Sequence, residues 1–270
     1  MEGHKPDIVK GREGTVILAG AGPGDLDLIT IRLTKALQRA EIIITDRLVN
    51  PAIIQTYANK NALILFAGKQ GYKDASVSVE EITALMTGYA LQGKTVLRLK
   101  GGDVAFFSNV LDELQSLVLN NITYEIIPGI TAASGASAYA GIPLTARGYA
   151  QGVQFLTYYT SNQFNPGKWK QLAVSTDTLV FYMSSHYAID IADEMIQYGA
   201  KGDTPIAVIE QATTPHQQVH VTSLSDCKID FADKSFSLSS LLIIGGVVKL
   251  HESFNWFGSM EKGTLFKQLT

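Results

Sequence analysis

Cysteine is almost absent from this sequence of 270 residues, which has a single thiol at Cys227. One thiol cannot form an internal disulfide, so a disulfide-stapled fold is excluded and a reducing compartment is favoured. Long apolar runs are also missing. The longest, at 241–248, is far below the roughly 20 residues of a membrane-spanning helix, and residues 1–14 lack the apolar core of a signal peptide. We expect a cytoplasmic protein with no membrane partner and an inert Cys227, at the surface or half-buried.

Charge of one sign is not in excess, and no metal-ligand pattern is present. The formal net charge is −3, so a general affinity for nucleic acid is not expected. Among the five histidines, only His216 and His220 are closely spaced. They lie in or beside a stretch that alternates like a strand, with no cysteine or carboxylate placed as a third ligand. We therefore expect no metal.

The first half of the chain alternates strands and helices. Apolar stretches predict strands at 15–19, 41–45, 62–66, 95–99 and 123–127. Thr30 is placed to cap one helix, and Ser78 with Glu81 forms a capping box for a second. A third helix is expected at 108–120, with these residues facing inward: Val110, Leu111, Leu114, Leu117 and Val118. Such alternation predicts a parallel sheet covered on both faces.

The pattern changes near residue 149, where strands become more frequent than helices. Strands are expected at 154–159, 178–182, 205–210, 218–224 and 240–245, with helices only near 169–174 and 188–198. The turn around 213–217 is typical of a hairpin and predicts antiparallel neighbours. We expect an α/β protein of two domains, at 14–148 with a mostly parallel sheet and at 149–258 with a mixed sheet. Residues 1–13 are expected to be a flexible tail and 259–270 a second tail.

A glycine loop follows the first predicted strand, with the sequence Gly20-Ala-Gly-Pro-Gly-Asp25. Its glycines permit backbone conformations that other residues avoid and let a ligand approach the main chain. A dinucleotide fingerprint is the alternative, with Asp46 as its later acidic residue. Asp25 occupies its third glycine position, however, and a carboxylate there would repel pyrophosphate.

Other polar motifs also follow predicted strands. They are Asp46-Arg47, Gly68-Lys69, Gly101-Gly102-Asp103 and the start of a small-residue helix at Pro128-Gly129-Ile130-Thr131. Ligands of open α/β sheets bind outside the carboxyl ends of the strands, so these motifs predict a small-molecule site. All six arginines lie at or before Arg147. Guanidinium groups bind carboxylates, so an anionic substrate is expected to be held mainly by the first half.

Together these motifs resemble the tetrapyrrole methylases, and among them the uroporphyrinogen-III C-methyltransferases. The matching segments are VILAGAGPGDLDLIT, ITDRLVNP, AGK, ALQGKTVLRLKGGD, IIPGITAASGASAYAGIPLTARGYAQ, TLVFYM, TPIAVIEQAT and LLIIGGVV. The resemblance runs from about residue 14 to 257. It implies a fold of two α/β domains with S-adenosylmethionine bound in the cleft between them. It also implies that methyl transfer converts this cofactor to S-adenosylhomocysteine. It also implies a homodimer and transfer of two methyl groups to pyrrole carbons of uroporphyrinogen III, giving precorrin-2 for sirohaem or cobalamin.

The resemblance also assigns site residues. Asp46 matches a proton acceptor and Lys69 a proton donor, while Arg47 and Arg147 are placed to bind substrate carboxylates. The residues expected to line the cofactor are Pro23, Gly101, Gly102, Asp103, Phe106, Thr131, Ala132, Met183 and Ala212.

The chain departs from the family pattern GGDPFIFGRGGEE after Asp103. Val104 replaces the proline, Asn109 replaces the loop arginine, and Gln211-Ala212-Thr213 replaces a usual Asn-Gly-Thr. Binding through backbone survives such changes, whereas a bidentate carboxylate contact does not. Three alternatives therefore stay open: methylation of another precorrin, a nucleotide-dependent dehydrogenase using NAD, or a non-catalytic binding protein.

Overall fold

The computed structural model describes residues 14–67, 78–160, 163–258 and 263–266. The chain forms two compact units. The first contains residues 14–21 and 29–129, and the second contains 22–28 and everything described from Ile130 onward. The chain therefore divides after Gly129 rather than after residue 148, because Ala133, Ala136 and Ala140 pack into the core of the second unit.

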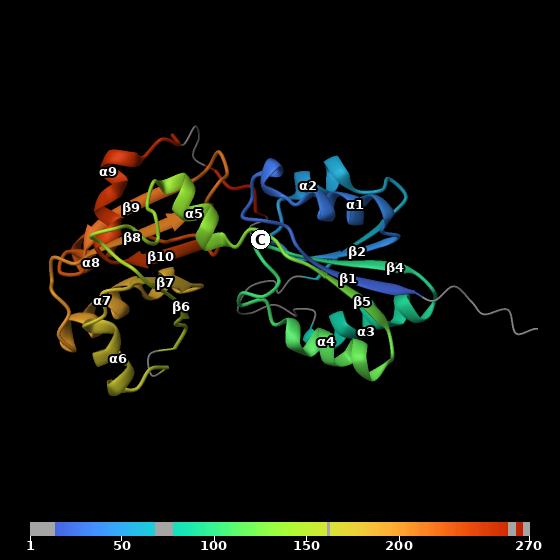
Figure 1. The fold of residues 1–270 in the computed structure, drawn as a ribbon, viewed down its shortest axis with the longest axis horizontal. Coiled ribbons are helices and arrows are strands. Elements are labelled where there is room, and N and C mark those ends of the chain that lie inside the picture. Colours follow the sequence, from blue (N-terminus) through green and yellow to red (C-terminus); the bar gives the residue numbers. More distant parts are fainter. Residues whose placement is uncertain (1–13, 68–77, 161–162, 259–262, 267–270) are drawn as a thin grey trace, which may run out of the picture. The chain divides into compact units, whose positions relative to one another are not determined.

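The first unit is a parallel sheet with helices on both faces, as expected (Figure 1). Its strand order is β3-β2-β4-β1-β5, and every pair is parallel. Helices α1 and α2 cover one face, while α3 and α4 cover the other. The elements are β1 (Thr15–Gly20), α1 (Ile31–Arg39), β2 (Ile42–Thr45), α2 (Pro51–Tyr57), β3 (Leu63–Phe66), α3 (Val79–Leu91), β4 (Thr95–Lys100), α4 (Val110–Leu119) and β5 (Thr123–Ile127).

Local sequence explains where the elements of this unit begin. Leu33 N donates to Thr30 Oγ1 at 3.1 Å, which caps α1. Ser78 and Glu81 form the expected capping box at the N-terminus of α3. All four residues of β2 are buried, which suits a strand covered on both faces. The inward face of α4 was predicted wrongly at two positions, because Leu111 and Val118 are 63% and 60% exposed while Leu117 is buried.

The second unit is built on a mixed sheet with the order β6-β7-β10-β8-β9. β6 and β7 are parallel, and β10 is antiparallel to both β7 and β8. The expected hairpin is confirmed as β8 and β9. The strands are β6 (Val153–Thr157), β7 (Thr178–Tyr182), β8 (Pro205–Glu210), β9 (Gln218–Ser223) and β10 (Ser240–Ile244).

Two hydrophobic clusters cover this second sheet. One includes Trp169, Ile191 and Phe231 from α6, α7 and α8, and the other includes the α5 alanines with Val247 and Val248. Sequence patterns found α6 and α7 but not the short elements η1, η2, α8, η3 and α9. The helices are η1 (Leu26–Leu28), α5 (Ala132–Ala140), α6 (Pro166–Ala173), η2 (Ser185–Tyr187), α7 (Ala188–Gln197), α8 (Cys227–Phe231), η3 (Gly246–Leu250) and α9 (His251–Phe254).

No helix in the described residues is long and apolar enough to cross a membrane. Cys227 is fully buried rather than at the surface or half-buried. Burial, with Asp193 and Asp230 nearby, raises the pKa of its thiol to about 12. The thiol therefore stays protonated at neutral pH, in agreement with the inert role expected for it.

Candidate functional site

In the first unit, the ends of three strands meet with almost no space between their backbones. A Cβ on Gly20 would lie 2.5 Å from Gly102 O and 2.8 Å from Gly129 N. Only glycine permits this approach, which brings the ends of β1, β4 and β5 together. The motifs expected at Gly101-Gly102-Asp103 and Pro128-Gly129 are therefore neighbours.

Asp103 ties these strand ends to each other. Its carboxylate accepts hydrogen bonds from Ala105 N at 2.8 Å and from Gly129 N at 2.7 Å. The residue is 8% exposed. Both carboxylate oxygens are used within the protein, so Asp103 builds the turn that carries Gly101, Gly102 and Phe106.

Asp46 lies directly after β2, where its Oδ1 accepts from Leu48 N at 3.0 Å. Burial raises the pKa of the Asp46 carboxyl, and the positive charges of Arg98 and Lys100 only partly oppose this. A carboxylate with a raised pKa is a stronger base than an ordinary aspartate, which suits it to accepting a proton. Lys69, its expected counterpart, lies outside the described residues.

A buried cluster of charges lies beside Asp46 and was not predicted from the sequence. Arg98 Nε and Lys100 Nζ each lie 2.9 Å from a carboxylate oxygen of Glu113, and all three side chains are at most 6% exposed. The available signal was two cations spaced by two in a strand whose neighbours are apolar, which places both on one face. With Asp46, Arg47 and Asn109 the cluster lines a pocket of about 260 Å³.

In the second unit, Thr131 and Ala132 lie at the start of α5. Thr131 Oγ1 is 2.6 Å from the hydroxyl of Tyr182, which also accepts from Ala133 N at 3.2 Å. Tyr182 therefore satisfies a helix-end donor that the Thr131 side chain does not cap. Met183 follows it with φ of 56° and is 52% exposed.

The turn after β8 carries Ala212 between two residues with left-handed backbone. Gln211 has φ of 46° and Thr213 has φ of 67°. Thr213 N donates to Gln217 Oε1 at 2.9 Å, while Asp25 N donates to Thr213 Oγ1 at 3.1 Å. The first glycine loop is thus joined to this turn within the second unit.

The same loop is held against α5 by packing and by a tyrosine. A Cβ on Gly135 would lie 2.5 Å from the ring of Pro23, so the small residues of α5 make room for the loop. Tyr139 OH donates to Asp25 Oδ2 at 2.9 Å. Only the three-residue η1 follows Asp25. The long helix whose N-terminus cradles pyrophosphate in a dinucleotide site is therefore missing from this position.

Residues near the end of the described chain also contact the turn after β8. Gln211 Nε2 donates to Gly263 O at 2.8 Å, and Gln211 Oε1 accepts from Leu265 N at 3.3 Å. Phe266 is 8% exposed. Part of the segment expected to be a tail therefore packs on the second unit.

Left-handed backbone is concentrated around the expected site residues. Among the described non-glycine residues, six have positive φ, and five of these adjoin expected cofactor or departure positions: Phe107, Asn109, Met183, Gln211 and Thr213. The sixth, Asn121, follows the end of α4, where such a conformation is common. Backbone strain of this kind gathers at ligand sites when the surrounding contacts enforce it.

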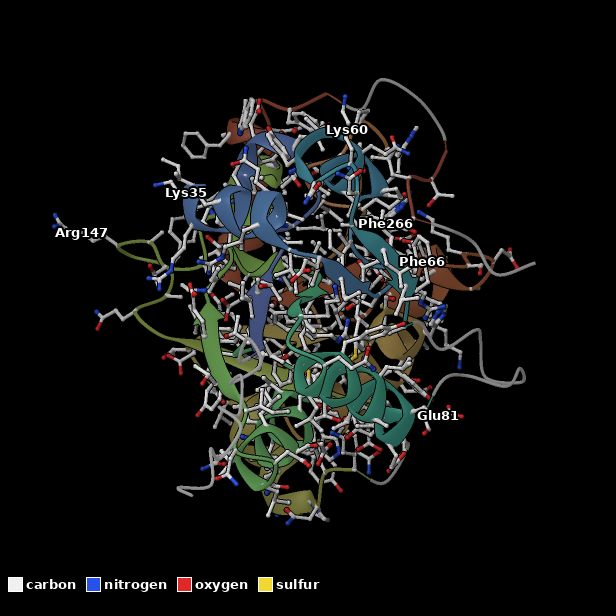
Figure 2. All side chains as sticks on the ribbon, turned by 90° about the vertical axis from the view of Figure 1, so that its right-hand side faces the viewer. Lys35, Lys60, Phe66, Glu81, Arg147 and Phe266 are labelled. Carbon is white, nitrogen blue, oxygen red and sulfur yellow. The ribbon has the colours of Figure 1, made fainter. Side chains whose placement is uncertain are left out.

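The remaining candidates are Arg147 and the closely spaced histidines. Arg147 is exposed and extends away from the ribbon in Figure 2. His220 Nε2 lies 2.9 Å from Glu210 Oε2, and its Nδ1 lies 3.1 Å from Lys234 Nζ, so both ring nitrogens have partners. No group of three His, Cys, Asp or Glu suited to a metal occurs within the described ranges.

Two α/β units with glycine turns at the ends of strands are typical of enzymes that bind small molecules. Comparison with known families identifies the family of this chain. Residues 15–228 match the model of the Tetrapyrrole (Corrin/Porphyrin) Methylases. The chain belongs to this family.

Curated relatives and solved structures agree with this assignment. The chain is 41% identical over 90% of its length to a siroheme synthase of Pseudomonas fluorescens, and 41% identical over 93% to one of Actinobacillus succinogenes. It spans about half the length of these relatives, 52% in each case.

Among solved structures, a uroporphyrin-III C-methyltransferase from Thermus thermophilus complexed with S-adenyl homocysteine has a TM-score of 0.73 and 28% identity. The match covers 87% of this chain and 99% of that one. A cobalt precorrin-4 methyltransferase has a TM-score of 0.76 and 27% identity, covering 87% and 95%.

Proposed function

We propose that this chain is an S-adenosylmethionine-dependent C-methyltransferase that methylates uroporphyrinogen III at two pyrrole carbons to give precorrin-2. The observation that carries the proposal is the similarity, over nearly the whole chain, to a uroporphyrin-III C-methyltransferase solved with S-adenyl homocysteine. The siroheme synthases that match over half their length support the same chemistry.

The residues proposed for cofactor binding fit such a molecule. The backbone is left-handed at Gly102 and Met183, and on both sides of Ala212 at Gln211 and Thr213. Gly101 precedes the first of these turns, and glycine lets a ligand approach the main chain. The exposed Phe106 offers an aromatic ring whose face attracts a cation such as a sulfonium, and the exposed Met183 adds apolar surface. The cofactor-binding residues proposed in the second unit also include Pro23, Thr131 and Ala132. In the first unit, Asp103 acts by shaping the turn that carries Gly101 and Gly102. No metal is proposed in the reaction.

When bound, S-adenosylmethionine supplies an electrophilic methyl group. The protein then has to hold an electron-rich pyrrole carbon in line with that group, so positioning dominates. Asp46 takes the proton released as the ring electrons rearrange, and its raised pKa favours that exchange. Lys69 is proposed as the proton donor, and Arg47 and Arg147 as partners of the substrate carboxylates.

We also propose a pathway, a compartment and an oligomeric state for the chain. The product would enter sirohaem or cobalamin synthesis, and the chain would work as a cytoplasmic homodimer. The single buried cysteine and the net charge of −3 support a reducing compartment and no nucleic-acid partner.

The test combines calorimetry with an anaerobic methylation assay. We expect the chain to bind S-adenosylmethionine and S-adenosylhomocysteine but not NAD. We expect uroporphyrinogen III to gain two methyl units by mass spectrometry. Binding of NAD alone, or a substrate that gains no methyl units, would contradict the proposal.

A second candidate is methylation of another precorrin. It is favoured by the altered turn with Val104 and Asn109, and by the similarity to a cobalt precorrin-4 methyltransferase. Val104 is buried in the first unit's core, whereas Asn109 lines the pocket beside Asp46. Methyl transfer to a precorrin at a higher rate than to uroporphyrinogen III would select this candidate.

A further inference from the structure

The pocket of the first unit contains cations whose hydrogen-bonding capacity is not used up. We propose that it binds a carboxylate-bearing side arm of the substrate, with Arg98 and Lys100 as the groups that hold the carboxylate. The identity of the substrate rests on the proposed function, but the binding of a carboxylate does not.

Arg98 lines this pocket and has N–H donors beyond its contacts with the described residues. Its Nε donates to Glu113 at 2.9 Å, and its Nη1 donates to Leu99 O at 3.1 Å and to Ile44 O at 3.4 Å. Its Nη2 has no acceptor among the residues that the structure describes. Since Arg98 lines the pocket, these N–H groups are available to an oxygen atom placed there.

Lys100 is fixed in a similar way. Its ammonium group donates to Ser108 O at 2.6 Å and lies 2.9 Å from Glu113 Oε2. An ammonium has three donors, so one remains beyond these two contacts. The two cations share one carboxylate, Glu113, and are both at most 6% exposed.

The charge balance of the pocket favours an anion. Its lining includes the cations Arg47, Arg98 and Lys100 and the carboxyl groups Asp46 and Glu113. Burial raises the pKa of Asp46 against the opposing charges of Arg98 and Lys100, and burial together with the charge of Arg98 lowers the pKa of Lys100, so both groups are poorly solvated. A carboxylate entering the pocket would offset this excess, because buried charges are stable when paired.

The rim of the pocket gives this site its selectivity. Asn109 lines it, is exposed, and stands where the related methylases have an arginine. Because the Asn109 amide is uncharged, the positive charge of the pocket comes from Arg47 and from the buried Arg98 and Lys100. A carboxylate arm short enough to reach that pair is therefore the expected ligand.

The test uses propionate as a probe of the full chain labelled with ¹⁵N-arginine, followed by NMR. The Arg98 side-chain signal is assigned as the one missing in Arg98→Lys. We expect it to shift saturably with propionate. Asn109→Asp places a carboxylate at the rim and should weaken this binding about tenfold by competing for the cations.

Asn121→Asp is the matched control. It makes the same exchange at a residue with the same φ of 53°, at the other end of α4 and outside the pocket. It should leave propionate binding unchanged. An Arg98 signal that propionate does not shift, or equal affinities in the two aspartate variants, would overturn the proposal.

The methylation assay separates this inference from the proposed function. Asn109→Asp should raise the KM for the tetrapyrrole about tenfold while the affinity for S-adenosylmethionine stays at the wild-type value. Normal methylation with equal KM in both aspartate variants would reject the carboxylate site and keep the function. Propionate binding without any methyl transfer would reject the function and keep the site.

Discussion

Replacement of Asp103 by alanine tests whether this residue acts by building the site. Its carboxylate accepts from Ala105 N and Gly129 N at 2.8 and 2.7 Å, and it is 8% exposed. Asp103→Ala removes the acceptor of two part-buried backbone hydrogen bonds. A hydrogen bond to a charged group contributes about 1.5–3 kcal/mol, and water reaches these donors in part, so we expect a loss of about 2–3 kcal/mol in the stability of the first unit.

Amide hydrogen exchange is the most direct assay, because the units need not unfold together. The amides of residues 105 and 129 should exchange at least about tenfold faster, since each 1.4 kcal/mol corresponds to a factor of ten. Asp112→Ala is the control, as Asp112 is exposed in the first turn of α4. Unchanged exchange at these amides, combined with lost cofactor affinity, would refute the structural role and make Asp103 a direct cofactor ligand.

Three further predictions follow from single contacts. Asp46→Asn should slow turnover at least about tenfold without changing cofactor affinity, and should abolish the rise in rate with pH that the raised pKa of Asp46 produces; an unchanged pH–rate profile would contradict this. Tyr139→Phe removes the hydrogen bond to Asp25 and should lower the free energy of unfolding by about 1 kcal/mol at neutral pH. Burial and the hydrogen bond to Asp25 raise the pKa of Tyr139 from 10 to about 12. The stability advantage of the wild type should therefore disappear as pH rises from 10 toward 12, and a difference in urea unfolding that stays constant over this range would count against it. Ser78→Ala should destabilise α3 by about 1 kcal/mol through loss of the box with Glu81, whereas an unaltered urea midpoint would argue that the cap is dispensable.

Local patterns predicted the strands and the longer helices, because the causes of these elements are local. The isoleucine strand before Asp46 and the capping box at Ser78 depend only on neighbouring residues, and both are present. The exposure of Leu111 and Val118 was not predictable in this way, because it depends on how α4 lies against the sheet. Helical spacing shows that a face is apolar, and tertiary packing decides how much of it is covered.

The sequence located the glycine turns at the strand ends, and their approach to a ligand stays a prediction. The hydrogen-bond partners of Asp103 were not predictable, because Gly129 is 26 residues away and the contact with Ala105 N depends on the geometry of the turn. Arg98 and Glu113 were missed because their pairing joins a strand to a helix. Asp25 was understood only as a departure from a glycine pattern, whereas its contact with Tyr139 spans 114 residues.

The path of the glycine loop has a consequence for engineering. Residues 22–28 belong to the second unit although β1 and α1, on either side of them, belong to the first. No single cut in the described chain can therefore release both units whole. A chimaera that exchanges the second unit with that of a relative must also carry the relative's residues 22–28, or Thr213 and Gly135 will face a loop that did not evolve with them.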